Sequence, residues 1–215
     1  MRSQRLRSFI MSDFTYEYNS AASPLETYEW DNNWLERCNI DTPRVLYVGD
    51  SISCATRKAL NRQAAGKLLF DGFGTSKALD NPYFTPSVKL WAAQQPGGRK
   101  FVLFNNGLHG WHLDDAEYAA AYDSFVEFLT TEFSDSQTVI LLTTHVRDAS
   151  RDERVVRRNR EVQAIAERRG LPVVDLYSIT KANPSLLSPD GVHLLPEGYD
   201  LLAEAILKMI CQKEN

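Results

Sequence analysis

Two short segments near opposite ends of the chain contain residue types that together can perform acyl transfer. Gly49-Asp50-Ser51 follows an apolar run, and Ser188-Pro-Asp-Gly-Val-His193 lies near the other end. A serine at the junction of a strand and a helix presents its hydroxyl on a sharp turn, and its N–H belongs to the unpaired first turn of the helix. Asp190 precedes His193 by three residues, so one turn lets the carboxylate accept the imidazole Nδ1 proton and leaves Nε2 free to take the Ser51 proton.

Each segment alone also has an ordinary structural explanation. Ser51 can serve only as the N-cap of a helix, which is the commonest role of a serine at such a position. Asp190 can bond backbone amides in a turn and leave His193 at the surface. The two segments together favour chemistry, because a nucleophile, a base and an orienting carboxylate are then all present.

The sequence between them alternates short apolar runs with longer amphipathic ones. Strands are predicted at 44–48, 67–70, 101–104, 138–143 and 171–176, and helices at 52–65, 86–93, 114–133, 152–169 and 196–211. Strands separated by helices of this length pair in parallel through right-handed crossovers. The sequence therefore predicts a three-layer α/β/α sandwich, in which loops at the carboxyl ends of the strands build the site.

Length and composition favour one globular domain preceded by an arm. The chain has 215 residues, of which 43% are hydrophobic and 24% charged, as expected for a single core. Residues 1–43 are polar and aromatic without a clear period, and are predicted to be an N-terminal extension that packs on a domain of residues 44–215. The first ten residues precede a second methionine, Met11, and are expected to take no part in the fold.

The charge balance and the cysteines argue against several classes of partner. Lys and Arg number 24 against 28 Asp and Glu, which gives a net charge of −4 and no excess positive field for nucleic acid or anionic lipid. The sequence shows no membrane-spanning apolar run and no secretory signal, so a cytoplasmic location is expected. Cys38, Cys54 and Cys211 form no C-x-x-C pair and are predicted to be buried thiols.

In order and context, the two segments resemble the SGNH/GDSL hydrolases, which are serine esterases and lipases. That family opens with a strand followed by Gly-Asp-Ser, as in Val45–Ser51, and closes with Asp-x-x-His before the last helix, as in Asp190–His193. The resemblance spans residues 44–210 and implies a parallel, flavodoxin-like sheet. It also implies catalysis by Ser51, His193 and Asp190 without a cofactor or a metal, on a short-chain ester such as an acetyl group carried by a small molecule or a carbohydrate.

The resemblance further implies an oxyanion hole that includes two backbone N–H groups. One belongs to the nucleophile, Ser51. The other belongs to a glycine after the second strand, for which Gly74 is the best match, with Gly72 or Thr75 as alternatives.

The third donor is the point at which this chain departs from the family. The family has Gly-x-Asn-Asp after the third strand, whereas this chain has Asn105-Asn-Gly-Leu-His109. Alignment on Gly107 puts His109 at the asparagine position, and Asn106 remains either an alternative donor or a support for the loop. A second hypothesis follows from the departure: a catalytically idle module of the same fold that binds a glycan or a protein. A nucleotide-binding protein is disfavoured, because no Gly-rich phosphate loop follows the first strand.

Four further residues are predicted to line a substrate pocket: Asp50, Phe73, Trp111 and His145. Aromatic residues at such positions often belong to the core instead. No metal site is predicted, because no acidic residue completes a ligand set with His109 and His112. The arginines of the fourth predicted helix are expected to form a solvated face; they are Arg154, Arg157, Arg158 and Arg160.

Overall fold

The structure is a computed structural model in which residues 24–95 and 97–213 are described. The strands are β1 (Asp31–Trp34), β2 (Arg44–Gly49), β3 (Leu69–Thr75), β4 (Arg99–Phe104), β5 (Gln137–Leu141) and β6 (Val173–Val174). The helices are α1 (Ser51–Ala64), α2 (Phe84–Ala92), α3 (Asp115–Glu132), α4 (Ala149–Arg168), α5 (Leu176–Ala182) and α6 (Pro196–Lys213), with one 3₁₀ turn, η2 (Pro184–Leu186). The ten residues predicted to take no part in the fold lie outside the described ranges, as does much of the predicted arm.

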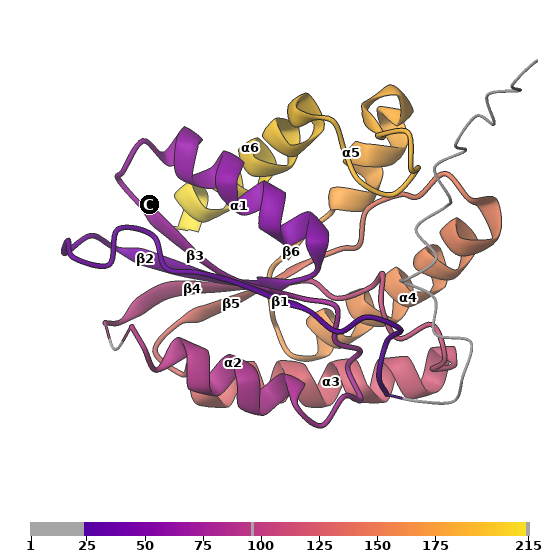
Figure 1. Cartoon of the computed structure of the whole chain (residues 1–215), viewed down its shortest axis with the longest axis horizontal. Helices are drawn as coiled ribbons and strands as arrows, with labels where there is room; N and C mark the ends of the chain where they lie inside the picture. Colours follow the sequence, from indigo (N-terminus) through magenta and orange to yellow (C-terminus); the bar gives the residue numbers. More distant parts are fainter. Residues whose placement is uncertain (1–23, 96, 214–215) are drawn as a thin grey trace, which may run out of the picture.

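One sheet runs through the centre of the molecule, with its strands in the order β1-β3-β2-β4-β5-β6. Strands β3, β2, β4, β5 and β6 pair in parallel, and β1 pairs antiparallel with β3 at the edge. Helices α1, α5 and α6 cover one face and α2, α3 and α4 cover the other (Figure 1). The predicted three-layer α/β/α sandwich with a parallel, flavodoxin-like sheet is thus confirmed.

The central strand β2 explains why the sheet has helices on both faces. All six of its residues are buried. Val45 and Tyr47 pack in the apolar cluster beneath α1 and α6, whereas Leu46 and Val48 pack in the cluster beneath α2 and α3. A strand buried on both faces is apolar along nearly all of its length, and the one charged residue of β2, Arg44, is paired with Asp71 of β3. The chain therefore leaves the interior of the sheet only at Gly49, directly before the predicted nucleophile.

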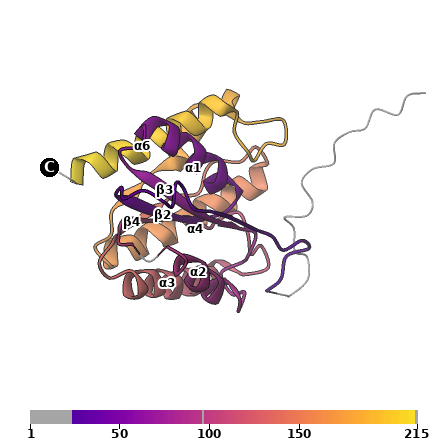
Figure 2. The same ribbon diagram turned by 60° about the vertical axis from the view of Figure 1, so that its left-hand side comes forward.

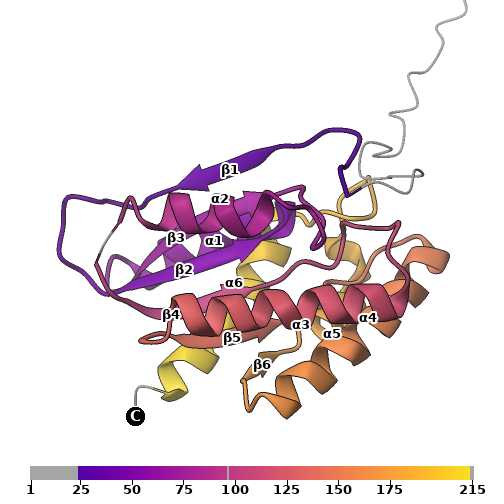
Figure 3. The same ribbon diagram turned by 90° about the horizontal axis from the view of Figure 1, so that it is seen from below.

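Three strands differ from the sequence prediction, and helix α5 was not predicted. The glycine-containing run after Phe70 is strand up to Thr75, because β1 pairs with it from the other side (Figure 3). Strand β1 itself was not predicted, since all four of its residues are exposed and show no apolar alternation. The strand predicted at 171–176 is reduced to β6, because the Asp175 side chain accepts the N–H of Ser178 at 2.9 Å and caps α5.

The cysteine prediction is wrong for two of the three residues. Cys38 and Cys211 are exposed, and Cys54 is half-buried. Cys38 lies in the turn region after β1, and Cys211 lies in the last turn of α6, the helix that leads to the C-terminus in Figure 2. Within the ranges that the structure describes, no helix is both long and apolar enough to cross a bilayer.

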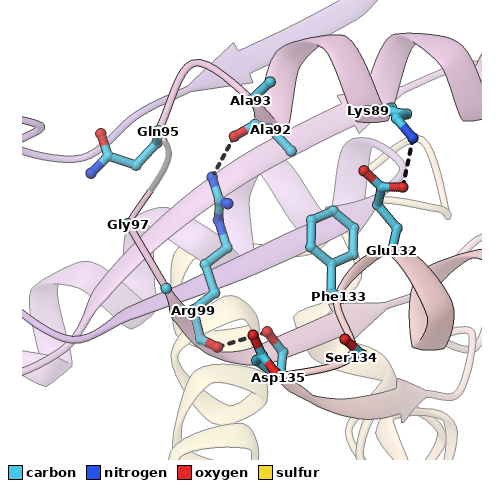
Figure 4. A pocket seen from close by; sticks show the side chains of 12 residues that line it. Lys89, Ala92, Ala93, Gln95, Gly97, Arg99, Glu132, Phe133, Ser134 and Asp135 are labelled. Atoms are coloured by element: carbon cyan, nitrogen blue, oxygen red, sulfur yellow. Dashed lines mark hydrogen bonds and ion pairs between the residues drawn. The ribbon is translucent and has the colours of Figure 1, made fainter.

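A cavity of about 270 Å³ lies at the amino ends of the strands, lined by Arg99 at the start of β4 and by the end of α2. The Arg99 side chain donates to the carbonyl of Ala92 at 3.2 Å, and Lys89 pairs with Glu132 at 2.8 Å on the rim (Figure 4). Open α/β sheets bind their ligands at the carboxyl ends of the strands instead. The predicted residues lie at that opposite end.

Candidate functional site

Ser51 stands at the first position of α1, immediately beyond the carboxyl end of β2. Asp50 is the N-cap, and its Oδ1 accepts the N–H of Ile52 at 3.0 Å. Gly49 permits this tight exit: a Cβ there would lie 2.7 Å from Cβ of Ser53 and 3.0 Å from the carbonyl oxygen of Asn105. The Ser51 N–H belongs to the helix turn that lacks internal acceptors. Its hydroxyl and its N–H therefore share one small region of the surface.

Asp190 organises the loop that carries His193. Its Oδ1 accepts the N–H groups of Val192 and His193 at 2.9 Å each and the hydroxyl of Ser188 at 2.6 Å. Its Oδ2 lies 2.8 Å from His193 Nδ1. Burial alone would raise the pKa of Asp190, but these hydrogen bonds outweigh burial and hold the pKa well below its usual range. Asp190 is therefore a carboxylate that fixes the imidazole ring.

His193 completes a chain of hydrogen bonds to the first helix. Its Nε2 lies 2.8 Å from Oγ of Ser51, a residue 142 positions away in the sequence. With Nδ1 protonated towards Asp190, Nε2 is the atom that can accept the serine proton. The structure thus brings together the three residues that the two sequence segments singled out.

Arg147, in the loop after β5, holds the Asp190 loop from outside. Its side chain donates to the carbonyls of Pro189 and Ser188 at 2.8 and 2.9 Å, and its N–H donates to the carbonyl of Gly191 at 2.8 Å. Gly191 has φ +76°, and a Cβ there would lie 2.8 Å from Cβ of Arg147. Sequence reasoning did not find Arg147, because nothing in its local pattern indicates a contact with a loop more than 40 residues away.

The loop after β4 contains both candidates for the third oxyanion donor, and it uses Asn106 for its own support. The Asn106 side-chain NH₂ donates to the carbonyl of Lys77 at 2.9 Å, and the backbone carbonyl of Asn106 accepts the hydroxyl of Tyr118 at 2.6 Å. At Gly107 a Cβ would lie 1.8 Å from Oγ1 of Thr143, so only glycine fits. Asn106 therefore anchors the loop to its neighbours.

His109 is differently placed. Its side chain is fully buried, and neither ring nitrogen has a hydrogen-bond partner among the described residues. Burial, together with the positive charges of Arg158 and His193, lowers the pKa of His109 to about 3. The imidazole is therefore neutral at physiological pH, with one N–H to donate and one lone pair to accept.

Arg158 supports the same loop from beneath. It is fully buried and donates to the carbonyls of Gly107, His109 and Gly110 at 3.1, 2.8 and 2.6 Å. Its guanidinium carbon lies 4.1 Å from the ring centre of Tyr118. Burial lowers the pKa of Arg158 to about 10, which leaves it charged at neutral pH. One buried cation thus fixes three backbone carbonyls within four residues of the loop.

The prediction of a solvated arginine face is wrong for Arg158, and Arg154 also turns inward. Arg154 donates to the carbonyl of Trp111 at 2.6 Å. The signal was present in the spacing: Arg158 lies between Val155 and Val162 on the buried side of α4. An arginine three residues from one buried valine and four from the next occupies the apolar face of the helix.

Gly74, the predicted backbone donor, is inside the sheet rather than in a loop. It is in register with Asn32 of β1 on one side and Gly49 of β2 on the other. Sulfur of Cys54 leaves no room for a side chain, since a Cβ at Gly74 would lie 2.1 Å from it. Gly74 is therefore a position of close packing between the sheet and α1.

Of the predicted pocket residues, Phe73 is a core residue and not a pocket wall. It is buried against Phe84 and Trp91, with ring centres 6.3 and 5.9 Å away. The alternation along β3 points it to the side covered by α2. Trp111 is half-buried and packs against Arg158, whose guanidinium carbon lies 4.8 Å from the ring centre.

His145 belongs to a separate polar cluster after β5. Its Nδ1 lies 2.5 Å from Oδ1 of Asp152, whose Oδ2 accepts hydrogen bonds from Tyr177 and Lys181 at 2.9 Å each.

Asp50, in contrast, is fully buried directly beside Ser51, and burial raises its pKa to about 6. In the part of the chain that the structure describes, no group of three or more His, Cys, Asp or Glu residues is arranged to hold a metal ion.

Comparison with known proteins relates this arrangement to solved structures. Neither a family model nor a curated protein sequence matches the chain. A lipase/acylhydrolase from Enterococcus faecalis has a TM-score of 0.63 at 16% identity, over 80% of this chain and 97% of the other. A member of the lipolytic G-D-S-L family from Veillonella parvula has a TM-score of 0.63 at 18% identity, over 78% and 97%. An acetyl xylan esterase has a TM-score of 0.61 at 14% identity, over 78% and 99%.

These similarities extend over nearly the full length of the other proteins, although fewer than one residue in five is identical. At such identities a structural match is evidence for architecture, while function has to be argued from the site. The topology, the strand order and the matched structures agree: this chain has the fold of the SGNH/GDSL hydrolases.

Proposed function

We propose that the protein is a serine esterase that hydrolyses a short-chain acyl ester, with acetyl on a carbohydrate as the first candidate substrate. The observation that carries the proposal is the continuous hydrogen-bonded chain from Asp190 through His193 to Ser51, with distances of 2.8 Å at both links. This is the geometry that general-base activation of a serine requires. No cofactor takes part in the proposed reaction.

In the first half-reaction the Ser51 hydroxyl attacks the ester carbonyl. His193 Nε2 accepts the hydroxyl proton, and the carboxylate of Asp190 stabilises the resulting imidazolium. His193 then returns the proton to the departing alkoxide as the ester C–O bond breaks, which leaves an acyl-serine. In the second half-reaction a water molecule attacks the acyl-serine, with His193 again acting as base, and the acid is released.

Negative charge on the carbonyl oxygen needs hydrogen-bond donors that are already in place. We assign this role to the N–H of Ser51 and to an imidazole N–H of His109. His109 is preferred over Asn106 because its ring nitrogens have no partner among the described residues, whereas the Asn106 amide is bonded to Lys77. Gly74 is not included, because it lies within the paired part of β3.

The acyl group and the carrier are proposed from two observations. One matched structure is an acetyl xylan esterase, and the loop after β4 contributes the polar residues Asn105, Asn106 and His109. A small acyl group on a polar alcohol fits such surroundings better than a long acyl chain does.

The test is hydrolysis of p-nitrophenyl esters of increasing chain length alongside acetylated xylo-oligosaccharides. We expect the highest kcat/KM with acetyl esters and a loss of about 10⁶-fold in kcat for Ser51→Ala. A fluorophosphonate probe should label the wild type and not the variant. Unchanged turnover in Ser51→Ala would show that the nucleophile is misassigned.

The second candidate function is a catalytically idle binding module, and the histidine in place of the family's asparagine favours it. Such a protein keeps the fold and binds an acetylated glycan or a protein without turnover. A wild-type protein that is folded, fails to react with the fluorophosphonate probe and hydrolyses no ester in the series would favour the binding module over the esterase.

A further inference from the structure

The segment before β1 contributes a buried carboxyl group to the loop after β4. Glu26 is only 6% exposed, and its Oε1 accepts the N–H of Gly110, 84 residues away, at 2.8 Å. Gly110 has φ +66°, which orients this N–H out of the loop towards the segment. A residue of the predicted N-terminal arm is thus fixed against the loop that carries the proposed oxyanion donor.

The same carboxyl group faces His109. Oε1 of Glu26 lies 3.8 Å from Nδ1 of His109, and the ring of Trp30 lies edge-on to the imidazole with ring centres 6.3 Å apart. Oε2 of Glu26 and both ring nitrogens of His109 are buried without a hydrogen-bond partner among the described residues. An unsatisfied buried polar atom destabilises the folded state, because it has lost its hydrogen bonds to water without gaining others. Three of them together mark a place where a functional constraint is expected.

The chemistry of a neutral imidazole gives this contact a role. One ring nitrogen carries the proton and the other accepts, and the partner of the first nitrogen decides which is which. Building on the proposed esterase function, we infer that Glu26 is a positioning residue: its carboxyl group selects the ring nitrogen of His109 that carries the proton, and so decides whether His109 can donate to the oxyanion.

Two protonation states of Glu26 have opposite consequences. As a carboxylic acid, Glu26 donates its O–H to Nδ1, the imidazole proton stays on Nε2, and Nε2–H can donate to the oxyanion. As a carboxylate, Glu26 accepts a hydrogen bond from Nδ1–H. Nε2 is then unprotonated, and its lone pair repels the oxyanion. Moving from 3.8 Å to a hydrogen bond of about 2.8 Å takes a shift of about 1 Å. Catalytic hydrogen bonds commonly tighten by such amounts when substrate binds.

The surroundings of Glu26 make both states accessible near neutral pH. Burial raises its pKa to about 7, against the lowering effect of the hydrogen bond from Gly110. Of the charged groups around it, Glu29 on the same segment raises the pKa, while His112 on the loop after β4 and Arg158 on α4 lower it. The acid form, which enables His109 to donate, therefore prevails below pH 7 and is lost as the pH rises above 7.

The first test observes the imidazole directly and does not depend on activity. In protein labelled with ¹⁵N-histidine, two-bond ¹⁵N–¹H spectra distinguish Nε2–H from Nδ1–H, and a His109→Phe variant assigns the signal among the four histidines. We expect Nε2–H at pH 6 and a change towards Nδ1–H by pH 8.5 in the wild type. A tautomer that stays the same across this range overturns the inference, even if the protein proves to be an esterase.

The second test uses variants and the pH dependence of turnover. In the wild type, kcat should decline as the pH rises above 7, and we call this the alkaline decline. Glu26→Gln keeps an acceptor for the N–H of Gly110 and supplies a permanent N–H donor to Nδ1 of His109. Its kcat at pH 7 should therefore stay within about threefold of wild type, and the alkaline decline should disappear. Glu26→Ala should lose about 10²-fold in kcat at pH 7 with little change in KM, as expected when one oxyanion donor is misdirected.

Glu29→Gln is the matched control. Its side chain accepts hydrogen bonds from Ser76 and Asn81, which follow β3, and from the N–H of Glu26. Because the charge of Glu29 raises the pKa of Glu26, the variant should retain the alkaline decline but shift it to lower pH. Thermal melts show whether each variant is folded. The inference is overturned if Glu26→Gln is as impaired as Glu26→Ala, or if it keeps the wild-type decline at high pH.

Discussion

The two halves of the candidate site are held together in different ways. The half with Asp190 and His193 is built within six residues, because Asp190 bonds Ser188, Val192 and His193 itself. The half with His109 depends on side chains from α4, α3 and the segment before β1, which reach it over 12 to 84 residues. The first half is a local turn whose geometry is encoded in its own sequence, whereas the second exists only in the complete fold.

After the loss of the nucleophile itself in Ser51→Ala, the largest effect is expected from Asp190→Asn, which isolates the local half. Asparagine keeps an oxygen for the turn N–H groups, but its NH₂ group faces Nδ1 and forces the imidazole proton onto Nε2. A base in the wrong tautomer cannot accept the serine proton, so kcat should fall about 10⁴-fold.

The measurement is ester hydrolysis together with a circular dichroism spectrum. An Asp190→Asn variant that retains more than about a tenth of wild-type kcat would mean that His193 does not depend on Asp190. Asp175→Asn, which alters the cap of α5 at a distance from the reacting groups, is a matched control and should leave kcat unchanged.

Arg158→Met tests the long-range half through stability. Methionine fills much of the same space but leaves the carbonyls of Gly107, His109 and Gly110 without their buried donor. Several unsatisfied acceptors should lower the free energy of unfolding by about 3–5 kcal/mol in urea denaturation. The exposed Arg160 on the same helix supplies the control, since Arg160→Met should stay within about 0.5 kcal/mol of wild type. Equal stability of the two variants would contradict the role given to Arg158.

The difference between local and long-range determinants also explains which elements of the fold could be predicted from the sequence. The apolar parts of β2 and β4, residues 45–48 and 101–104, are buried on both faces, and their positions follow from composition alone. Strand β1 is fully exposed, so no pattern indicated it, and its pairing extended β3 through the glycines. Long amphipathic helices such as α3 were found because their apolar faces repeat over several turns.

The site divides in the same manner. Ser51, Asp190 and His193 were identified because each lies in a short segment whose residue types and spacing imply a proton relay. Arg158 and Glu26 were not identified, because their roles depend on contacts with a loop 48 to 84 residues away. Burial of a charged residue on the apolar face of a helix is a signal that sequence spacing does carry, and Arg158 shows how easily a cluster of arginines conceals it.

Substitution of His109 should affect turnover more than binding. Removal of one oxyanion donor costs about 10²–10³ in kcat, so His109→Ala should lose this factor with KM changed less than threefold. His109→Asn introduces the residue that the family has at this position, and it should recover part of the loss through its amide N–H. Steady-state kinetics with an acetyl ester provide the measurement. If His109→Ala is fully active, the oxyanion donor must be sought elsewhere, with Asn106 as the next candidate.

Asp50→Asn is expected to have the smallest effect, and it concerns stability. The pKa of Asp50 is raised by burial from 3.8 to about 6, so the native state binds more protons than the unfolded state between these values. The contribution of protonated Asp50 to the free energy of unfolding is therefore fully present below pH 4 and is lost as the pH rises through 6. The asparagine side chain accepts a hydrogen bond from the Ile52 N–H and carries no charge. The free energy of unfolding of the variant, relative to that of wild type, should therefore rise by about 3 kcal/mol between pH 4 and pH 7.

Asp190 responds to pH in the opposite direction, which makes it the internal comparison for Asp50. Its pKa is depressed by hydrogen bonds that outweigh burial, so its contribution to stability is present at neutral pH and is lost on acidification. Asp190→Asn should therefore be less stable than wild type at pH 7 and approach it in acid, whereas Asp50→Asn should be the more stable protein at pH 7. Urea denaturation at pH 4 and pH 7 checks the sign for Asp50. For Asp190 the comparison is between pH 4 and pH 2, because stabilisation from a depressed pKa is lost only below the ordinary value of 3.8. If the difference in stability between Asp190→Asn and wild type stays the same from pH 4 to pH 2, hydrogen bonding is not what distinguishes the carboxyl group beside His193 from the one beside Ser51.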